Sequence, residues 1–282
     1  MPAKQIPTAI MYDFDGTLSP INMQEHEFIP KLGYKSSKDF WDEVKALAKE
    51  QYCCEILSYM HTMLREAKHK KIPINRKAIR KYGKGLELFP GVEGWFDRIN
   101  SEAKKYNVKL EHYIISSGVK PLIEGTSIAK HFKRIYACDF IYDADGNPIA
   151  PGVAINYTSK TQYIFRINKG TLDQSDNRMI NEYVPMNKRP TPIENMIFVG
   201  DGSTDIPAMK VTKSYGGLSI AVYNPKKNKV KDYAKKLVEN GRANCAVAAD
   251  YNPDKKLENI IMARIAEISA THNRNHMIER LN

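Results

Sequence analysis

Two aspartates stand one residue apart in the stretch MYDFDGTLSP, where Asp13 and Asp15 close an apolar run and precede Gly-Thr-Leu. Alternate residues of an extended chain point to the same side, so the two carboxylates can face one reacting atom. Like charges this close resist sharing a site of low dielectric constant. Carboxylates serve in proteins as nucleophiles, as general acids or bases and as cation ligands. The pair therefore indicates a reactive site with compensating positive charge.

Further polar motifs follow, each where an apolar run ends or a helical pattern opens. They are Ile114-Ile115-Ser116-Ser117-Gly118, Thr158-Ser159-Lys160 and Phe198-Val199-Gly200-Asp201-Gly202-Ser203-Thr204-Asp205. In open α/β sheets, ligands bind outside the carboxyl ends of the strands. The motifs are therefore expected to meet with Asp13 at one edge of a sheet.

The elements that would position these motifs alternate along the chain. TAIMY (8–12) predicts a first strand, and from residue 92 onward short apolar runs alternate with helical patterns. The further apolar runs are VKLEHYIIS, RIYACDFIY, VAINY, NMIFVGD, LSIAVYN and CAVAAD. Strands that alternate with helices of this length favour an α/β fold with a mostly parallel sheet. The chain ends in a long amphipathic helical stretch.

Residues 21–87 have a different character. Apolar residues from Phe40 to Leu64 recur close to the helical period, Ser36-x-x-Asp39 offers an N-cap, and Pro73 is a stop signal. The pattern predicts one long helix with no strand beside it, and a second helix after Asn75. We therefore predict an α/β core domain of residues 1–20 and 88–282 and an inserted helical cap domain of residues 21–87.

Two segments carry weaker signals. Asp143-x-Asp145-Gly146-Asn147 shares part of its pattern with a calcium-binding loop but lacks the remaining ligands and the terminal Glu, so residues 140–152 are predicted to form a β-hairpin. Residues 169–195 are polar and contain proline, which predicts a long surface excursion. The histidines lack metal-binding spacing, and no metal is assigned to them.

Together, in this order, the motifs resemble those of the haloacid dehalogenase (HAD) superfamily of phosphohydrolases. The resemblance covers nearly the whole chain, and the helical insert resembles the first-type cap of the phosphoserine-phosphatase-like branch. It implies a Rossmann-like core and a phosphatase that hydrolyses a small phosphomonoester through an aspartyl-phosphate. The acidic residue at Asp15 favours phosphoryl chemistry, because the family's dehalogenases and ATPase relatives lack an acid there.

The resemblance also implies a role for each motif residue. Asp13 would be the nucleophile, and Asp15 would be the general acid and base. Ser116, with the backbone amides of Ser117 and Gly118, would bind the phosphate. Lys160 would neutralise Asp13 and bind phosphate, with Lys169 as a competing choice.

A divalent cation is expected, because two carboxylates beside a phosphate repel it and each other. Mg²⁺ suits a site rich in carboxylates that faces phosphate. By the resemblance the ion would lie between the Asp13 carboxylate, the Asp15 backbone carbonyl and Asp201. Asp205 would support it indirectly, by holding a water or by orienting Asp201.

Composition limits the class of protein. The chain has 282 residues, 42% of them hydrophobic and 27% charged, and a formal net charge of +11. It contains no apolar run long enough to span a membrane and no signal-type apolar region, which predicts a cytoplasmic location with no membrane partner. Cys53, Cys54, Cys138 and Cys245 are predicted to be free thiols.

Much of the positive charge is local, since residues 65–85 hold nine Lys or Arg and one Glu. The expected partner is a small phosphorylated metabolite drawn by a basic rim. A nucleic-acid-binding protein on the same scaffold is the alternative from another class, although the full catalytic set argues against it. A phosphotransferase that uses the same intermediate also remains open. Gln24, Glu25, His26, Arg65, Arg76 and Arg80 are candidates for contact with the substrate.

Overall fold

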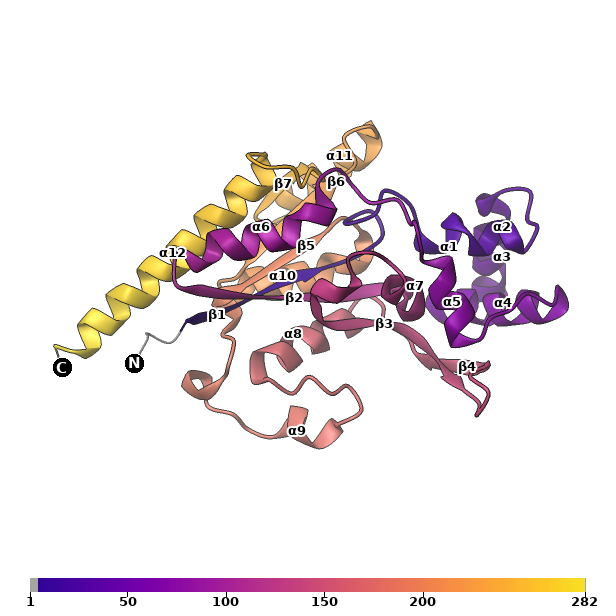
Figure 1. Cartoon of the computed structure of the whole chain (residues 1–282), viewed down its shortest axis with the longest axis horizontal. Helices are drawn as coiled ribbons and strands as arrows, with labels where there is room; N and C mark the ends of the chain where they lie inside the picture. Colours follow the sequence, from indigo (N-terminus) through magenta and orange to yellow (C-terminus); the bar gives the residue numbers. More distant parts are fainter. Residues whose placement is uncertain (1–4, 282) are drawn as a thin grey trace.

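The protein is built on a seven-stranded sheet in the order β4-β3-β2-β1-β5-β6-β7 (Figure 1). The computed structural model describes residues 5–281. The strands are β1 (Ile6–Tyr12), β2 (Val108–Val119), β3 (Phe132–Tyr142), β4 (Pro148–Val153), β5 (Met196–Gly200), β6 (Leu218–Tyr223) and β7 (Cys245–Ala248). Only β4 pairs antiparallel, as the second arm of the β3–β4 hairpin. The predicted α/β fold with a mostly parallel sheet is therefore confirmed.

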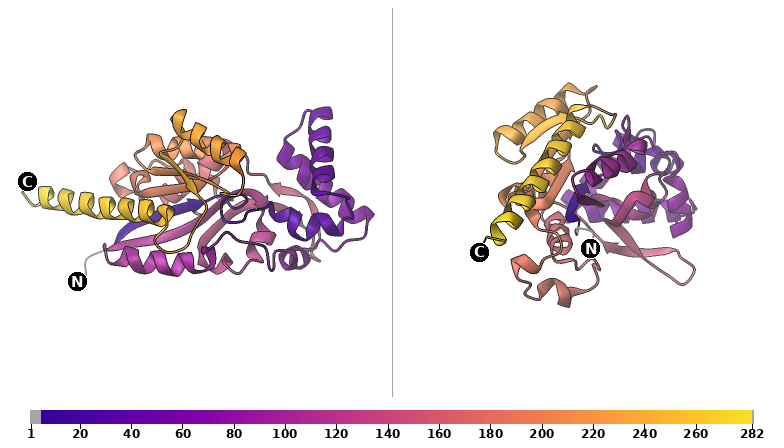
Figure 2. Two further views of the ribbon diagram at one scale, coloured as in Figure 1. Left: turned by 90° about the horizontal axis from the view of Figure 1, so that it is seen from above. Right: turned by 60° about the vertical axis from the view of Figure 1, so that its left-hand side comes forward.

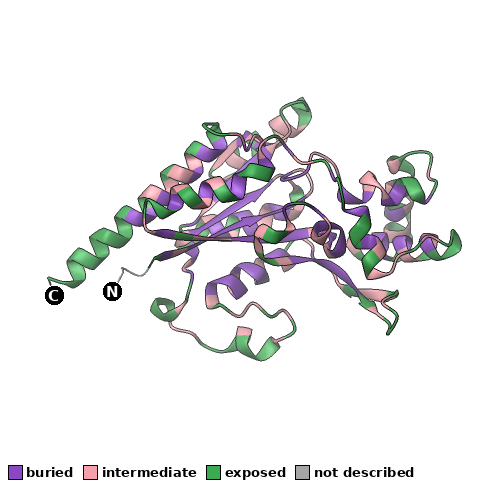
Figure 3. Cartoon of the chain, in the orientation of Figure 1, coloured by how far each residue is buried: buried purple, intermediate pink, exposed green. Residues whose placement is uncertain are grey.

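Helices cover both faces of the sheet. On one face, α6 (Val92–Lys104) packs against β2 and against α12 (Lys256–Glu279). On the other face, α8 (Ser159–Lys169), α10 (Ile206–Ser214) and α11 (Asn228–Glu239) lie together (Figure 2). Most residues of the central strands β1, β2 and β5, which lie between these layers, are buried (Figure 3). This burial on both faces explains why the strand sequences are nearly continuous apolar runs.

A group of helices follows β1 and lies beyond the carboxyl edge of the sheet, beside the β3–β4 hairpin (Figure 1). They are α1 (Met23–His26), α2 (Phe28–Lys31), α3 (Ser37–Glu50), α4 (Glu55–His69) and α5 (Arg76–Tyr82). Ser36 is the N-cap of α3, as predicted, and forms a capping box with Asp39, while Asn75 caps α5 by accepting the Ala78 N–H. A further short helix, α7 (Lys120–Glu124), follows β2 and packs against α5.

The prediction of one long helix through residues 40–64 is wrong, because the helix breaks between α3 and α4. Tyr52 adopts a φ of 50°, and the Cys53 N–H donates to the Ala48 carbonyl at 3.0 Å. This 6→1 hydrogen bond with a left-handed residue closes a helix end. The two helices pack on each other, so apolar residues keep their helical spacing across the break.

The predicted strand VAINY is also wrong. β4 ends at Val153, and residues 154–157 form a loop that leads into α8. The predicted hairpin at 140–152 is confirmed, and its turn places Gly146 at a φ of +79°. The excursion 169–195 includes the helix α9 (Asn177–Asn181), and the buried Arg166 guanidinium donates to four of its backbone carbonyls, those of Thr171, Asp173, Gln174 and Asp176.

All four cysteines are free thiols. Among residues 5–281, no helix combines the length and the apolar character that a membrane crossing requires.

Candidate active site

Asp13 lies directly beyond the end of the central strand β1. Its N–H donates to the Val199 carbonyl of β5 at 2.9 Å, so the chain stays attached to the sheet past the last strand residue. The residue is only 6% exposed. A mostly buried strand thus leads directly to a carboxylate at the edge of a pocket.

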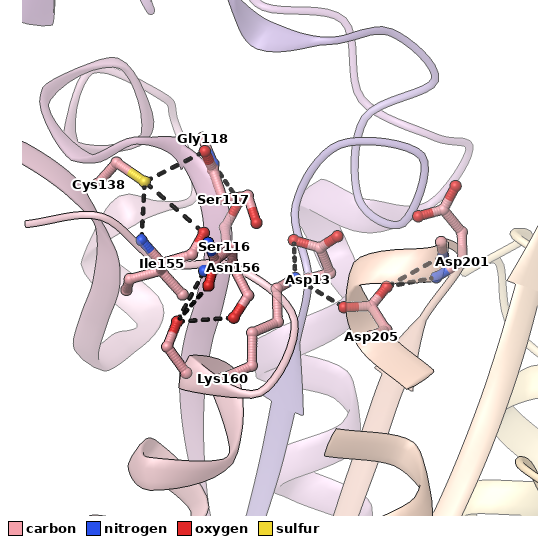
Figure 4. Close-up of polar contacts among 12 residues, drawn as sticks. Asp13, Ser116, Ser117, Gly118, Cys138, Ile155, Asn156, Lys160, Asp201 and Asp205 are labelled. Carbon is pink, nitrogen blue, oxygen red and sulfur yellow. Dashed lines mark hydrogen bonds and ion pairs between the residues drawn. The ribbon is translucent and has the colours of Figure 1, made fainter. Parts of the chain in front are cut away.

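Lys160 supplies a buried positive charge to this carboxylate. It lies in the first turn of α8 with no exposed surface. Its Nζ lies 3.2 Å from Asp13 Oδ1 and 2.7 Å from Asp205 Oδ1 (Figure 4). Burial lowers the pKa of Lys160, but the two carboxylates more than offset this effect and raise it overall. The lysine therefore stays charged between two aspartates from different strand ends.

Asp205 uses both of its carboxylate oxygens inside the protein. Oδ1 accepts from Lys160, and Oδ2 accepts the backbone N–H groups of Asp201 at 3.1 Å and Gly202 at 3.0 Å. A Cβ on Gly200 would lie 2.6 Å from Asp205 Oδ2, so glycine permits this close approach. Asp205 therefore fixes the loop that presents Asp201.

Negative charge exceeds positive charge at this edge of the sheet. Burial, followed by the Asp205 carboxylate, raises the pKa of Asp13 to about 6 against the lowering effect of Lys160. The same two causes raise the pKa of Asp201 well above its ordinary value. Ligand oxygens of Asp13, Asp201 and Asp205 lie within 4.8 Å of one another. Hard carboxylate oxygens in this arrangement fit a divalent cation such as Mg²⁺.

The loop that follows Asp13 brings Asp15 and Asp201 together. Gly16 has a φ of +75°, and a Cβ there would lie 2.0 Å from Asp201 Oδ2. The Met23 N–H, at the start of α1, donates to Asp15 Oδ1 at 2.9 Å. Burial and the neighbouring Asp13 raise the pKa of Asp15 well above its ordinary value. Asp15 is therefore biased toward its protonated form.

Ser116, Ser117 and Gly118 line the same pocket from the carboxyl end of β2. The pairing of β2 with β3 shifts between Ile115 and Val119, so these residues lie inside an irregular strand end and not after it. The Gly118 N–H donates to Ser116 Oγ at 3.0 Å. A Cβ on Gly118 would lie 2.0 Å from Met23 Cε, so the glycine admits α1 to the site.

A pocket of about 590 Å³ joins these loops to the helices beyond the sheet. Every predicted site residue lines it except Lys160 and Asp205, which lie behind Asp13 with no exposed surface. Lys169, the competing choice, lies elsewhere, since its Nζ donates to the Ile180 and Glu182 carbonyls at 2.6 and 2.7 Å. The geometry thus favours Lys160.

Of the candidates for substrate contact, Gln24 and Glu25 line the pocket, and His26 does not. Arg65 pairs with Glu43 and Glu66, and Arg76 pairs with Glu124 and Asp139, both at 3.1 Å. The wall also includes residues that sequence reasoning missed, namely Asn22, Trp41, Cys54, Glu55, Tyr59, Tyr157 and Lys227. They belong to no motif, and only the packing of α1, α3, α4, the loop before α8 and the start of α11 brings them together.

Comparison with known proteins agrees with this geometry. The model of the haloacid dehalogenase-like hydrolase family matches residues 10–210, which contain every site residue that the sequence predicts. The chain belongs to the haloacid dehalogenase-like hydrolases. The predicted family is therefore confirmed, and with it the prediction that the protein is a hydrolase. An uncharacterized protein of Borreliella burgdorferi is 32% identical over 91% of this chain and 96% of its own length.

Solved structures share the fold of this HAD-like hydrolase. A phosphoserine phosphatase bearing an analogue of a phospho-aspartyl intermediate has a TM-score of 0.51 at 16% identity, over 86% of this chain and 94% of its own. A HAD family hydrolase of Salmonella enterica serovar Typhi has a TM-score of 0.55 at 15% identity, over 87% and 68%. At this identity the likeness concerns the fold.

Proposed function

We propose that this HAD-like hydrolase is a Mg²⁺-dependent phosphatase that acts on a small phosphorylated metabolite in the cytoplasm. The observation that carries the proposal is the buried arrangement of Asp13 and Asp205 around Lys160, with Asp13 Oδ1 3.2 Å from the Lys160 Nζ. A carboxylate kept at the edge of a pocket beside a fixed cation is suited to nucleophilic attack. Helices α1–α5 would form the predicted cap over this pocket.

In the first step, an Asp13 carboxylate oxygen attacks phosphorus, and the bond between phosphorus and the alcohol oxygen breaks. Asp15 gives its proton to the departing oxygen, which suits a carboxyl group whose pKa is raised by burial. In the second step, Asp15 takes a proton from water as the water attacks the aspartyl-phosphate. Inorganic phosphate leaves, and both aspartates return to their starting forms.

The remaining motif residues would hold the transferred phosphoryl group. Lys160 supplies a full positive charge without any exposed surface, so little solvent screens it. Ser116 Oγ accepts the Gly118 N–H, which leaves the Ser116 hydroxyl proton free to donate to an anion. Such donors stabilise charge that develops on phosphoryl oxygens.

Asp13, Asp201 and the backbone carbonyl of Asp15 would hold Mg²⁺, with Asp205 as their support. The excess of negative charge at these carboxylates fits a divalent cation. When bound, Mg²⁺ supplies charge neutralisation on the phosphate and orients it toward Asp13. This fit rests on the donor set of the described residues.

The substitution Asp13→Asn tests the mechanism. The variant is expected to fold, with an unchanged circular dichroism spectrum, and to lose phosphate release from p-nitrophenyl phosphate entirely, because an amide cannot form the acyl phosphate. Mg²⁺-dependent hydrolysis that persists in the variant would contradict the proposal. Added acceptor alcohols reveal a phosphotransferase, since phosphorylated acceptor then appears in place of free phosphate.

Chelation tests the metal. We expect EDTA to stop hydrolysis and Mg²⁺ to restore it. Mg²⁺ should also raise the melting temperature of the wild type and have a smaller effect on Asp201→Asn, because the variant loses one ligand and part of the repulsion that the ion relieves. Full activity in thoroughly chelated buffer would refute the metal requirement.

A further inference from the structure

The pocket has a second wall, made by α1, α3 and α4, that no motif explains. Gln24 and Glu25 come from α1, Trp41 from α3 and Glu55 from the first turn of α4. An adjoining surface hollow shares Asn22, Glu25, Trp41 and Glu55 with this pocket, and it also contains Lys45 and Lys38, of which Lys38 pairs with Asp42. These side chains therefore stand at the entrance through which a leaving group would extend away from Asp13.

Gln24 is the most deeply buried member of this second wall. Only 2% of the residue is exposed, and its Oε1 atom accepts no hydrogen bond from the described residues. The side chain lies beside the buried Tyr59 hydroxyl, which itself donates to the Ser117 carbonyl at 2.7 Å. A buried acceptor without a donor costs free energy unless a bound molecule supplies one. A hydrogen-bond donor on the substrate would therefore satisfy the Gln24 Oε1 atom.

Glu25 brings a charged acceptor to the same wall. Its Oε1 accepts from Trp41 Nε1 at 2.8 Å and from Asn22 Nδ2 at 2.6 Å. These two bonds fix the carboxylate, while Oε2 has no hydrogen-bond donor among residues 5–281. The Glu25 charge also adds to the raised pKa of Asp15, after burial and Asp13, so it acts on the reacting end of the pocket.

Two hydrogen bonds of Met23 hold α1 in place. The Met23 N–H donates to Asp15, and Met23 Sδ accepts the Val119 N–H at 3.2 Å. Met23 therefore fastens the helix to the loops that hold the predicted general acid and the phosphate site. Gln24 and Glu25 follow directly, so their distance from the reacting phosphate is set by the same contacts.

Within the pocket, the charged residues of the second wall are all acidic. Glu25 and Glu55 are acidic, Trp41 and Tyr59 add aromatic surface, and none of the lining residues of α1, α3 and α4 is Lys or Arg. Lys227, the one Lys or Arg among the described lining residues, precedes α11 on the far side of the sheet edge. A second anionic group on the leaving alcohol would meet uncompensated carboxylates. A cationic group would be neutralised by Glu25 and attracted to the aromatic faces.

We propose that Gln24 and Glu25 are specificity-determining residues that select phosphomonoesters whose leaving alcohol carries a protonated amine and no carboxylate. The amine donates to Glu25 Oε2 and Gln24 Oε1, and the phosphate lies at Asp13. This assignment rests on the proposed phosphatase function. Glu55, which is exposed at the pocket mouth, adds charge without a direct contact.

Matched esters test the selection. We would compare kcat/KM for O-phosphoethanolamine, n-propyl phosphate, phosphocholine and phosphoglycolate, which place an N–H cation, a neutral methyl, a quaternary cation and an anion near the same position. The wild type should prefer O-phosphoethanolamine to n-propyl phosphate by roughly ten- to a hundredfold, the value of a charge-assisted hydrogen bond. Phosphocholine should fall between them, and phosphoglycolate should react slowest.

Variants assign the preference to residues. Glu25→Gln should bring the ratio of kcat/KM for O-phosphoethanolamine and n-propyl phosphate close to one, mainly through KM for the amine. Gln24→Met should reduce the preference for O-phosphoethanolamine over phosphocholine. Glu27→Gln is the matched control, since Glu27 follows α1, pairs with Lys31 at 3.6 Å and lies outside the pocket lining. It should leave all ratios unchanged.

The outcomes separate the two levels of the proposal. Hydrolysis of p-nitrophenyl phosphate by the wild type but not by Asp13→Asn supports the phosphatase. If that holds while the amine ester has no advantage, or while Glu25→Gln leaves the advantage intact, the selection is refuted and the phosphatase stands. Absence of hydrolysis for every ester overturns both.

Discussion

The two walls of the pocket are built in different ways. At the sheet edge, Lys160 and Asp205 have no exposed surface, and the Lys160 Nζ pairs with Asp205 and with Asp13, which follow different strands. On the side of α1–α5, charged groups are partly exposed, as in the Arg76 pairs with Glu124 and Asp139, where 41% of the arginine side chain is exposed. Buried ion pairs therefore hold the charged groups at the sheet edge, whereas the ion pairs on the side of α1–α5 remain accessible to solvent and salt.

The largest expected effect is at the buried lysine. Lys160→Met leaves the Asp13 and Asp205 carboxylates without a cation, which should lower the free energy of unfolding by on the order of 3 kcal/mol. Turnover should fall by roughly 10²–10³-fold, as for the loss of one group that stabilises transition-state charge. Urea unfolding and phosphate release measure the two effects.

Lys169→Met is the matched control, because it removes the same charge from the same helix. Lys169 donates only to carbonyls of the 169–195 excursion, so turnover should be unchanged. Equal losses of turnover and stability in both variants would show that the buried position of Lys160 contributes nothing specific. The contrast between the two walls would then be wrong.

A smaller, pH-dependent effect is expected within the sheet. Burial lowers the pKa of His112 in β2 to about 3, from 6.5. A group whose pKa is lowered by folding stabilises the protein above its unfolded pKa, and this contribution is lost as the pH falls. The free energy of unfolding of the wild type should therefore fall by roughly 1.4 kcal/mol per pH unit between about pH 6 and pH 4 because of His112. This contribution should be absent from His112→Asn.

Urea midpoints at several pH values provide the measurement for His112. His61→Asn is the control on the helical side, since His61 is exposed in α4 and its replacement should leave the wild-type pH dependence in place. If His112→Asn lost as much stability on acidification as the wild type, His112 would not be the source of the acid sensitivity. The interpretation of His112 as a neutral side chain hydrogen-bonded to Tyr12 and Asn100 would then be wrong.

The smallest effect is expected at the contact of α5 with the core. Arg76→Ala removes the pairs with Glu124 and Asp139, but partial exposure limits their value to about 1 kcal/mol. High salt should weaken the wild type by a similar amount and leave the variant unaffected. A loss as large as that of Lys160→Met would show that the helical side depends on electrostatics as strongly as the sheet edge does.

Strand positions were readable from the sequence because parallel strands buried on both faces need nearly continuous apolar runs. Asp13 and Asp201 could be placed because each follows such a run directly. The sequence did not reveal the break between α3 and α4, because apolar residues keep their helical spacing across it. The turn depends on the left-handed backbone of Tyr52. VAINY was misread because only Val153 belongs to a strand, while the apolar Ile155 is buried within the loop that leads into α8.

The sequence by itself determined which side chains could carry out the chemistry. Asp13, Asp15 and Asp201 follow apolar runs, and parallel strands must bring such ends to one edge. Only the tertiary structure decided the rest. It placed the Lys160 Nζ between two aspartates while Lys169 binds surface carbonyls, and it set Gln24 and Glu25 against Trp41. These outcomes depend on distances between residues far apart in the chain, which local patterns do not encode.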